Sequence, residues 1–253
     1  MIKPSSFSRF ESSYLKVERS KIHAEQFKSS IAEFFATNPY RAVIDPNSTN
    51  ASKQLIIEQI EPTPKTLPLI IGDVIHNLRS ALDHLASDLV LFKKASLDSV
   101  YFPTGVDKDG YHNALTKPIR KAGLDAIKRL AKVEAYYGGN GAIIRALHDL
   151  DVADKHRAIV PTLNRALVTN IRAVGGGYDL FFAGITLPVV NGRASLLKDY
   201  VGVDIQFDEA KPLDVSFGEP PLIASESIGE TLEKMTKAVV AIIDSFANDP
   251  TYS

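Results

Sequence analysis

The sequence predicts an α+β fold, and three observations support this prediction. Hydrophobic residues recur at helical spacing through most of residues 5–157. The repeat changes to alternation over residues 166–217, and helical spacing returns over residues 227–248. A repeat near 3.6 residues is typical of amphipathic helices, whereas a period of two is typical of half-buried strands. We therefore expect a body of long antiparallel helices, an antiparallel β portion and a closing C-terminal helix.

The composition is that of an ordinary globular protein. The chain has 253 residues, of which 45% are hydrophobic and 23% charged, so a sizeable core is expected. A formal net charge of -1 gives no overall basic field, so an anionic ligand must be attracted by a local patch. The absence of cysteine excludes disulfides and thiolate metal sites and fits a reducing compartment.

Neither a targeting segment nor a membrane span is expected. The first residues lack the apolar core of a secretory signal. No apolar run approaches the roughly 20 residues that are needed to span a bilayer. We therefore expect a cytoplasmic protein that does not associate with a membrane.

The N-terminal third predicts a helix, a hairpin and a second helix. Aromatic and aliphatic residues recur at helical spacing over residues 5–36, and Asn38-Pro39 ends this helix. Residues 40–45 and 53–61 read as two strands around a PNSTNAS turn. Prolines then lead into a long helix over residues 67–93.

The remainder of the chain predicts two more helices, four strands and a closing helix. We expect a connection with a short extended piece over 95–109, one basic amphipathic helix over 118–134 and a helix over 141–157. In the basic helix, Leu124, Ile127, Leu130 and Val133 are expected to point inward. The expected strands are 166–174, 178–187, 200–207 and 213–217, with turns at the glycines of 175–177 and at Asn191-Gly192.

These elements predict one compact unit over residues 1–253. It divides into a mainly helical part with one hairpin over 1–161, a β portion over 162–226 and the closing helix over 227–253. No segment between the helical and β parts is long enough to act as a flexible linker.

The long helix over residues 67–93 carries an unusual polar face. Between Asp73 and Phe92 it contains neither lysine nor glutamate, the good helix formers that usually cover a solvated face. Short polar groups, two histidines and an arginine occupy this face instead: Asp73, His76, Asn77, Arg79, Ser80, Asp83, His84 and Ser87. We infer that this polar stripe meets a requirement other than contact with bulk water.

Arg79 and His84 are the candidate catalytic residues of this stripe. They lie five positions apart, roughly 140° around a helix, so both side chains can reach one groove. An arginine binds phosphate through its fork of donors, and a histidine exchanges a proton near neutral pH. Together they could cleave a phosphodiester without a metal. The alternative is a structural network in which Arg79 bonds to Asp83 one turn away.

The Arg79-x4-His84 spacing resembles the signature of the HEPN superfamily, which comprises helical domains common in bacterial toxins and phage-defence ribonucleases. The resemblance implies metal-independent RNA cleavage by attack of the ribose 2′-hydroxyl. It also implies a homodimer in which Arg79 and His84 of both chains form one cleft. Arg79 would hold the scissile phosphate, and His84 would act in proton transfer or orientation.

The stretches HNLRSALDHL and LHDLDVADKHR also resemble a group of bacterial proteins of unknown function, which suggests that the two segments belong together. On the second segment, Asp154 is expected to point inward and Asp151 to lie at the border. An inward carboxylate is costly unless it is paired. We expect Asp154 to pair with Arg157 or with a residue of the long helix. The residues expected to support the site are His76, Asn77, Ser80, Asp83, Asp151, Asp154, His156 and Arg157.

Three functional hypotheses follow. The leading one is a HEPN-like endoribonuclease or RNA-binding defence protein, for which the basic helix is the expected secondary RNA contact through Arg120, Lys121, Lys128, Arg129 and Lys132. The second is a non-enzymatic structural or regulatory module with a buried polar network between helices. The third is a metal-dependent enzyme with histidine and aspartate ligands. The Glu-x-x-His pairs usual in helical metal sites are absent from the long helix, so we expect no metal and no other cofactor.

Overall fold

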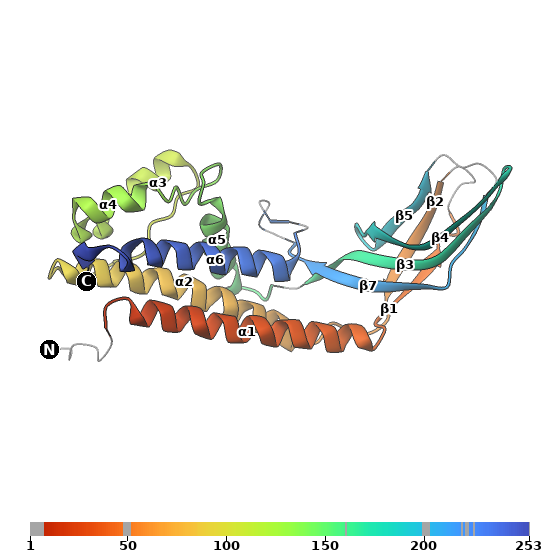
Figure 1. The fold of residues 1–253 in the computed structure, drawn as a ribbon, viewed down its shortest axis with the longest axis horizontal. Coiled ribbons are helices and arrows are strands. Elements are labelled where there is room, and N and C mark those ends of the chain that lie inside the picture. Colours follow the sequence, from red (N-terminus) through yellow and green to blue (C-terminus); the bar gives the residue numbers. More distant parts are fainter. Residues whose placement is uncertain are drawn as a thin grey trace.

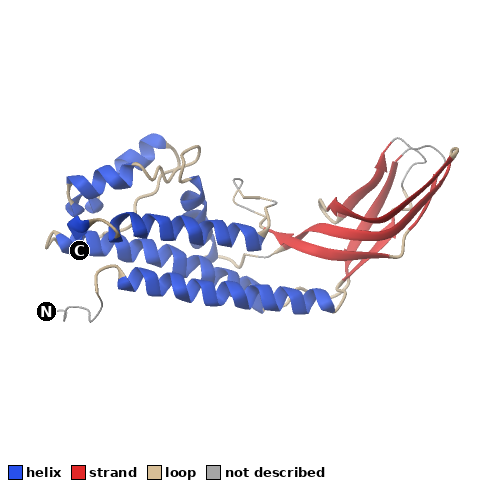
Figure 2. Cartoon of the chain, in the orientation of Figure 1, coloured by secondary structure: helices blue, strands red, loops and turns tan. Residues whose placement is uncertain are grey.

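The structure is a computed structural model that describes residues 8–47, 52–159, 161–198, 203–218, 220, 223–224 and 226–252. The predicted α+β class is confirmed. Helices gather at one end of an elongated molecule and antiparallel strands at the other (Figures 1 and 2). Among the described residues, no helix combines the length and the apolar character needed to cross a membrane.

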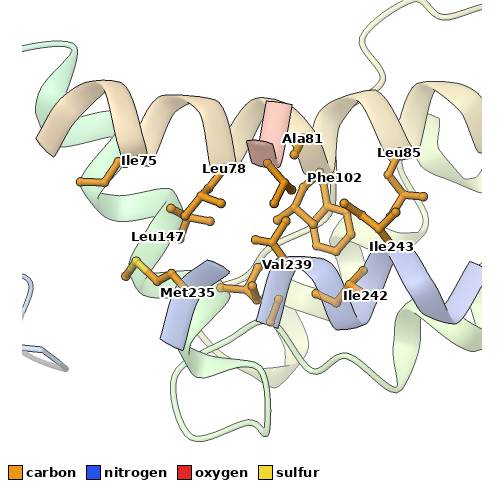
Figure 3. Close-up of a cluster of buried hydrophobic side chains, with 14 of the residues drawn as sticks. Ile75, Leu78, Ala81, Leu85, Phe102, Leu147, Met235, Val239, Ile242 and Ile243 are labelled. Carbon is orange, nitrogen blue, oxygen red and sulfur yellow. The ribbon is translucent and has the colours of Figure 1, made fainter. Parts of the chain in front are cut away.

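Helix α2 (Thr66–Phe92) is the central element of the helical body. It packs against α1 (Glu11–Ala36), α5 (Ala142–Asp154) and α6 (Ile228–Ala247), so most of its apolar residues are buried, whereas Leu69 and Leu91 are exposed. Figure 3 shows side chains of α2 meeting those of α5, α6 and the segment after α2: Ile75, Leu78, Ala81, Leu85, Phe102, Leu147, Met235, Val239, Ile242 and Ile243. The positions of these helices agree with the sequence pattern; residues 5–7 of the first predicted helix lie outside the described part.

The region between α2 and α5 differs from the prediction in two ways. Helix α3 (Lys108–Leu115) was not predicted, although Asp107 caps it by accepting a hydrogen bond from the Gly110 nitrogen at 2.7 Å. The predicted single helix 118–134 is instead a 3-10 turn η1 (Pro118–Ala122) followed by α4 (Leu124–Ala131). Gly123 separates them at φ +90°, outside the helical region, and this leaves Leu124 78% exposed rather than inward.

The strands form two antiparallel sheets. The predicted hairpin is confirmed: β1 (Tyr40–Ile44) pairs with β2 (Ser52–Gln59), and β5 (Arg193–Lys198) extends this sheet. In the second sheet, β3 (Thr162–Gly175) pairs with β4 (Tyr178–Pro188), β6 (Val203–Gln206) and β7 (Glu209–Ser216). Strand β5 was not predicted, and residues 200–202 of the strand predicted over 200–207 lie outside the described part.

The β portion has a hydrophobic cluster of its own. Both sheets contribute to it, through Ile57 and Ala194 of the three-stranded sheet and through residues of the second sheet such as Val168, Ile171 and Leu187. Pairing of β2 with β5 joins the N-terminal hairpin to a segment more than 130 positions later in the chain.

The last described element belongs to the helical body. The short 3-10 turn η2 (Pro250–Tyr252) follows α6 and packs Tyr252 against the helical core.

Candidate functional site

The polar stripe of α2 meets α5. His76 Nδ1 lies 3.0 Å from Asp151 Oδ1, and Lys155 donates a hydrogen bond to Asp151 Oδ2 at 2.6 Å. Asp151 is only 3% exposed, so these two partners compensate for burial of its carboxylate. The two segments that the sequence suggested belong together are therefore in direct contact.

The expectation that Asp154 forms the buried pair is wrong, because Asp151 occupies that role. Asp154 makes no hydrogen bond or ion pair within the described part of the chain. Its carboxylate sits over Gly72 of α2, where an added Cβ would lie 2.4 Å from Asp154 Oδ1. Burial and the neighbouring carboxylates Asp151 and Asp73 raise the pKa of Asp154, and His76 opposes this effect.

Arg79 is buried, with 5% of its surface exposed, and it binds the segment that follows α2. Its Nη2 donates to Asp83 Oδ1 at 2.8 Å and to the carbonyl oxygen of Phe102 at 3.0 Å. Asp83 Oδ1 also accepts from the Phe102 backbone nitrogen at 2.8 Å. The Arg79–Asp83 pair thus holds both backbone polar groups of Phe102. The i+4 pairing considered from the sequence is present.

The other terminal nitrogen of Arg79, Nη1, is buried and has no hydrogen-bond partner. Buried polar groups without partners are uncommon in native proteins and suggest an absent ligand or water. Arg79 lines a pocket of about 690 Å³, a volume suited to a small ligand or part of a larger one. The pocket is bounded by α2, the segment after it, α3, η1 and α5.

Basic groups outnumber acidic groups around this pocket. Lys117 and Lys155 line it together with Arg79. Its two carboxylates, Asp83 and Asp151, pair with Arg79 and Lys155, so Lys117 is the excess cation. Lys117 is exposed, and its side chain makes no hydrogen bond or ion pair with the residues that the structure describes. We refer to this cavity below as the Arg79 pocket; its charge favours an anionic ligand.

His148 of α5 also lines the Arg79 pocket. Burial, followed by the positive charges of Arg79 and Arg145, lowers the pKa of His148 from 6.5 to about 4. Its imidazole is therefore neutral at pH 7, and its buried Nδ1 has no partner. Sequence reasoning assigned no role to His148. Its position three residues before Asp151 places both on the same helix face, and this spacing is the signal that could have identified it.

His84 does not share the Arg79 pocket. It lies near Asp88, whose pKa is raised by burial, an effect that the hydrogen bond from the Phe10 nitrogen and the charge of His84 oppose. Asp88 Oδ2 accepts that bond at 3.0 Å, at the start of α1. Arg79 instead faces Phe102 and α5. Of the two candidate catalytic residues, Arg79 lines this pocket within one chain and His84 does not.

Asn77 and Ser80 contact other residues of α2, and Asn77 also contacts α1. Asn77 donates to the Asp73 carbonyl oxygen at 2.8 Å and accepts from Lys16 at 3.3 Å, and Ser80 Oγ lies 3.5 Å from His76 Nε2. The predicted helix 141–157 ends at Asp154, so His156 and Arg157 follow α5 and are exposed.

In the described part of the chain, no three histidine or carboxylate side chains are arranged to hold a metal ion.

The basic residues of η1 and α4 do not form one uniform surface. Lys121 donates to the carbonyl oxygens of Ser96 and Asp98, and Arg129 pairs with Asp249. Exposed Arg120, Lys128 and Lys132 make no such contacts with the described residues.

Comparison with known proteins identifies no relative from which a role for these residues could be transferred: no family model, curated protein or solved structure matches the chain.

Proposed function

We propose that this protein binds an RNA phosphate in the Arg79 pocket and cleaves the RNA chain without a metal ion. The observation that carries the proposal is the buried Arg79 guanidinium, whose Nη1 has no partner and which lines a pocket with a net excess of basic groups. A guanidinium presents paired donors that match phosphate oxygens, and the low dielectric of a buried site strengthens that interaction. Lys117 and Lys155 would hold neighbouring phosphates or the same one.

His148 is the proton acceptor in this proposal. Because its pKa is about 4, its imidazole is unprotonated at neutral pH and is available to take a proton. The ribose 2′-hydroxyl gives its proton to His148, and the 2′-oxygen then forms a bond to phosphorus. The bond from phosphorus to the 5′-oxygen breaks, and that oxygen takes a proton from Lys155 or water. The products are a 2′,3′-cyclic phosphate and a 5′-hydroxyl.

A bound phosphate would make His148 a stronger base. The charge of Arg79 is one of the causes of the low pKa of His148, and a phosphate beside Arg79 offsets that charge. The pKa of His148 would then rise toward neutrality when RNA is bound. Proton transfer is most effective when the pKa of the base is near the working pH.

The HEPN resemblance leads to a different version of the same chemistry. In that version two copies of the chain form a homodimer, and His84 acts in a cleft between them rather than in the Arg79 pocket. Because His84 and His148 are separate in the structure, variants of the two histidines distinguish the two versions.

The experiment compares wild-type protein, His148→Gln and His84→Gln on end-labelled single-stranded RNA in the presence of EDTA. We expect His148→Gln to reduce the cleavage rate by about 100-fold or more and His84→Gln to cleave like the wild type. The reverse result would support the HEPN-like dimer. Absence of cleavage by the wild-type protein, or equal cleavage by all three, would refute the ribonuclease proposal. Thermal unfolding of each variant verifies that it is folded.

A structural role for the same arginine is the second candidate. It is favoured by the bonds from Arg79 and Asp83 to both backbone groups of Phe102, which anchor the segment after α2. Under this candidate the protein neither binds nor cuts RNA, and Lys117→Gln or Lys155→Gln has no effect in an RNA-anisotropy assay. Under the ribonuclease proposal each lysine variant binds RNA more weakly, and the dependence of affinity on salt becomes less steep.

A further inference from the structure

A second and larger pocket lies elsewhere in the helical body. It occupies about 790 Å³ between α4, the start of α5 and α6, and it is separate from the Arg79 pocket. Figure 1 shows α4 beside the C-terminal part of α6. The size falls within the range of about 300–1,000 Å³ that is typical of small-molecule sites.

The floor of this pocket is apolar. Hydrophobic side chains from three elements line it: Val133, Ile143, Ile144, Ala238, Ala241 and Ile242. The two alanines leave room where larger residues of α6 would fill the space. A ligand with a hydrocarbon body would bury apolar surface here, and such burial stabilises a complex by about 25 cal/mol per Å² before the cost of association.

Contacts from Arg129 connect two of the elements that border the pocket. Its guanidinium donates to the Ser245 carbonyl oxygen and to the Asp249 carboxylate, and it lies over the Phe246 ring, 5.3 Å from the centroid. These bonds tie α4 to the end of α6. Because Arg129 is occupied in this way, its charge is largely offset by Asp249.

Two lysines without partners lie at the rim. Lys128 and Lys132 are four positions apart and exposed, and neither side chain forms a hydrogen bond or ion pair with residues in the described part of the chain. The other acidic group that lines the pocket is Asp125. With Arg129 and Asp249 paired, the remaining groups are two cations and one carboxylate, so the rim favours a compact anion.

We propose that this pocket binds an amphipathic organic anion, with a hydrocarbon body on the apolar floor and a carboxylate or sulfonate head between Lys128 and Lys132. RNA fits less well, because an apolar floor and the carboxylates of Asp125 and Asp249 do not suit a polyanionic chain. The inference uses none of the residues of the Arg79 pocket and is independent of the proposed ribonuclease activity.

The test is isothermal titration of the full-length protein with dodecanoate, and with dodecyltrimethylammonium as a probe of opposite charge. We expect one dodecanoate per chain and markedly weaker binding of the cation. Replacing both Lys128 and Lys132 by Gln should weaken dodecanoate binding by about tenfold. Ala241→Leu, which fills the pocket, should weaken it as well.

The matched control replaces Lys65 and Lys108 by Gln. Both are exposed, neither lines this pocket, and the change in net charge is the same. This control should bind dodecanoate like the wild type. The proposal is overturned if wild-type protein does not bind dodecanoate, or if the two double variants bind it equally. It is also overturned if the Lys128/Lys132 variant loses affinity for RNA but keeps its affinity for dodecanoate.

Discussion

Replacing Arg79 by Met should destabilise the fold by about 2 kcal/mol. The methionine keeps most of the hydrophobic stem, so the change removes mainly the polar contacts. The Phe102 carbonyl oxygen loses its bond to Arg79 in a buried position, which costs about 1–3 kcal/mol. Asp83 loses its cation but keeps the Phe102 nitrogen as a donor, and its side chain is 29% exposed, so its penalty is smaller than for a fully buried charge.

A smaller term acts in the opposite direction. Arg79 Nη1 is buried without a partner in the folded protein, and the variant no longer bears that desolvation cost. This term reduces the loss from the 3–5 kcal/mol typical of breaking a buried ion pair to about 2 kcal/mol.

Urea denaturation followed by circular dichroism measures this change as a shift in midpoint at constant slope. Asp83→Asn is the matched variant, because it removes the carboxylate charge and keeps a side-chain oxygen that can accept from the Phe102 nitrogen. We expect it to cost less than Arg79→Met, and we expect the double variant to cost less than the sum of the two. A free energy of unfolding within about 0.5 kcal/mol of the wild type for Arg79→Met would refute the anchoring role of the pair.

Three further predictions concern other parts of the helical body. Because the folded pKa of His148 is about 4 and its ordinary value is 6.5, the neutral imidazole contributes stability that is complete above pH 6.5 and is lost as the pH falls toward 4. We expect this loss to be about 2 kcal/mol after allowance for partial solvent exposure, and His148→Gln should reduce the dependence of the unfolding free energy on pH in this interval. Gly72→Ala places a methyl group 2.4 Å from Asp154 Oδ1, the end of a flexible, half-buried side chain that can turn away, and alanine favours a helix over glycine, so the free energy of unfolding in urea should fall by less than about 1 kcal/mol. A larger loss that Asp154→Ala does not restore would show that the Asp154 side chain is not what occupies this space. Gly123→Ala forces an alanine to φ +90°, so it should destabilise the fold by about 1–2 kcal/mol and lower the melting temperature. An unchanged melting temperature would show that the fold does not require this backbone conformation between η1 and α4.

Periodicity predicted the elements that are long and regular. The burial pattern of α2 and α6 follows from hydrophobic residues repeated over many turns, so local irregularities do not obscure it. The short α3 was missed because eight residues contain too few turns to show a repeat. The break at Gly123 was missed because a glycine within a helical pattern does not reveal its φ angle.

The candidate site was predicted only in part. The sequence indicated correctly that the polar face of α2 meets the segment containing Asp151. It did not predict that His84 lies outside the pocket of Arg79, or that His148 lines that pocket. A helical wheel gives the angle between two side chains but not the element that each one meets.

The sequence by itself determined the α+β class, the long central helix and the hydrophobic faces on which it packs, because these depend on repeats within single segments. The tertiary structure alone decided the pairing of β2 with β5, the burial of Asp151 rather than Asp154 and the assembly of the Arg79 pocket from α2, α3, η1 and α5. Each of these depends on contacts between segments far apart in the chain. The geometry of such contacts is set by how whole helices and sheets pack, which no local pattern of residues contains.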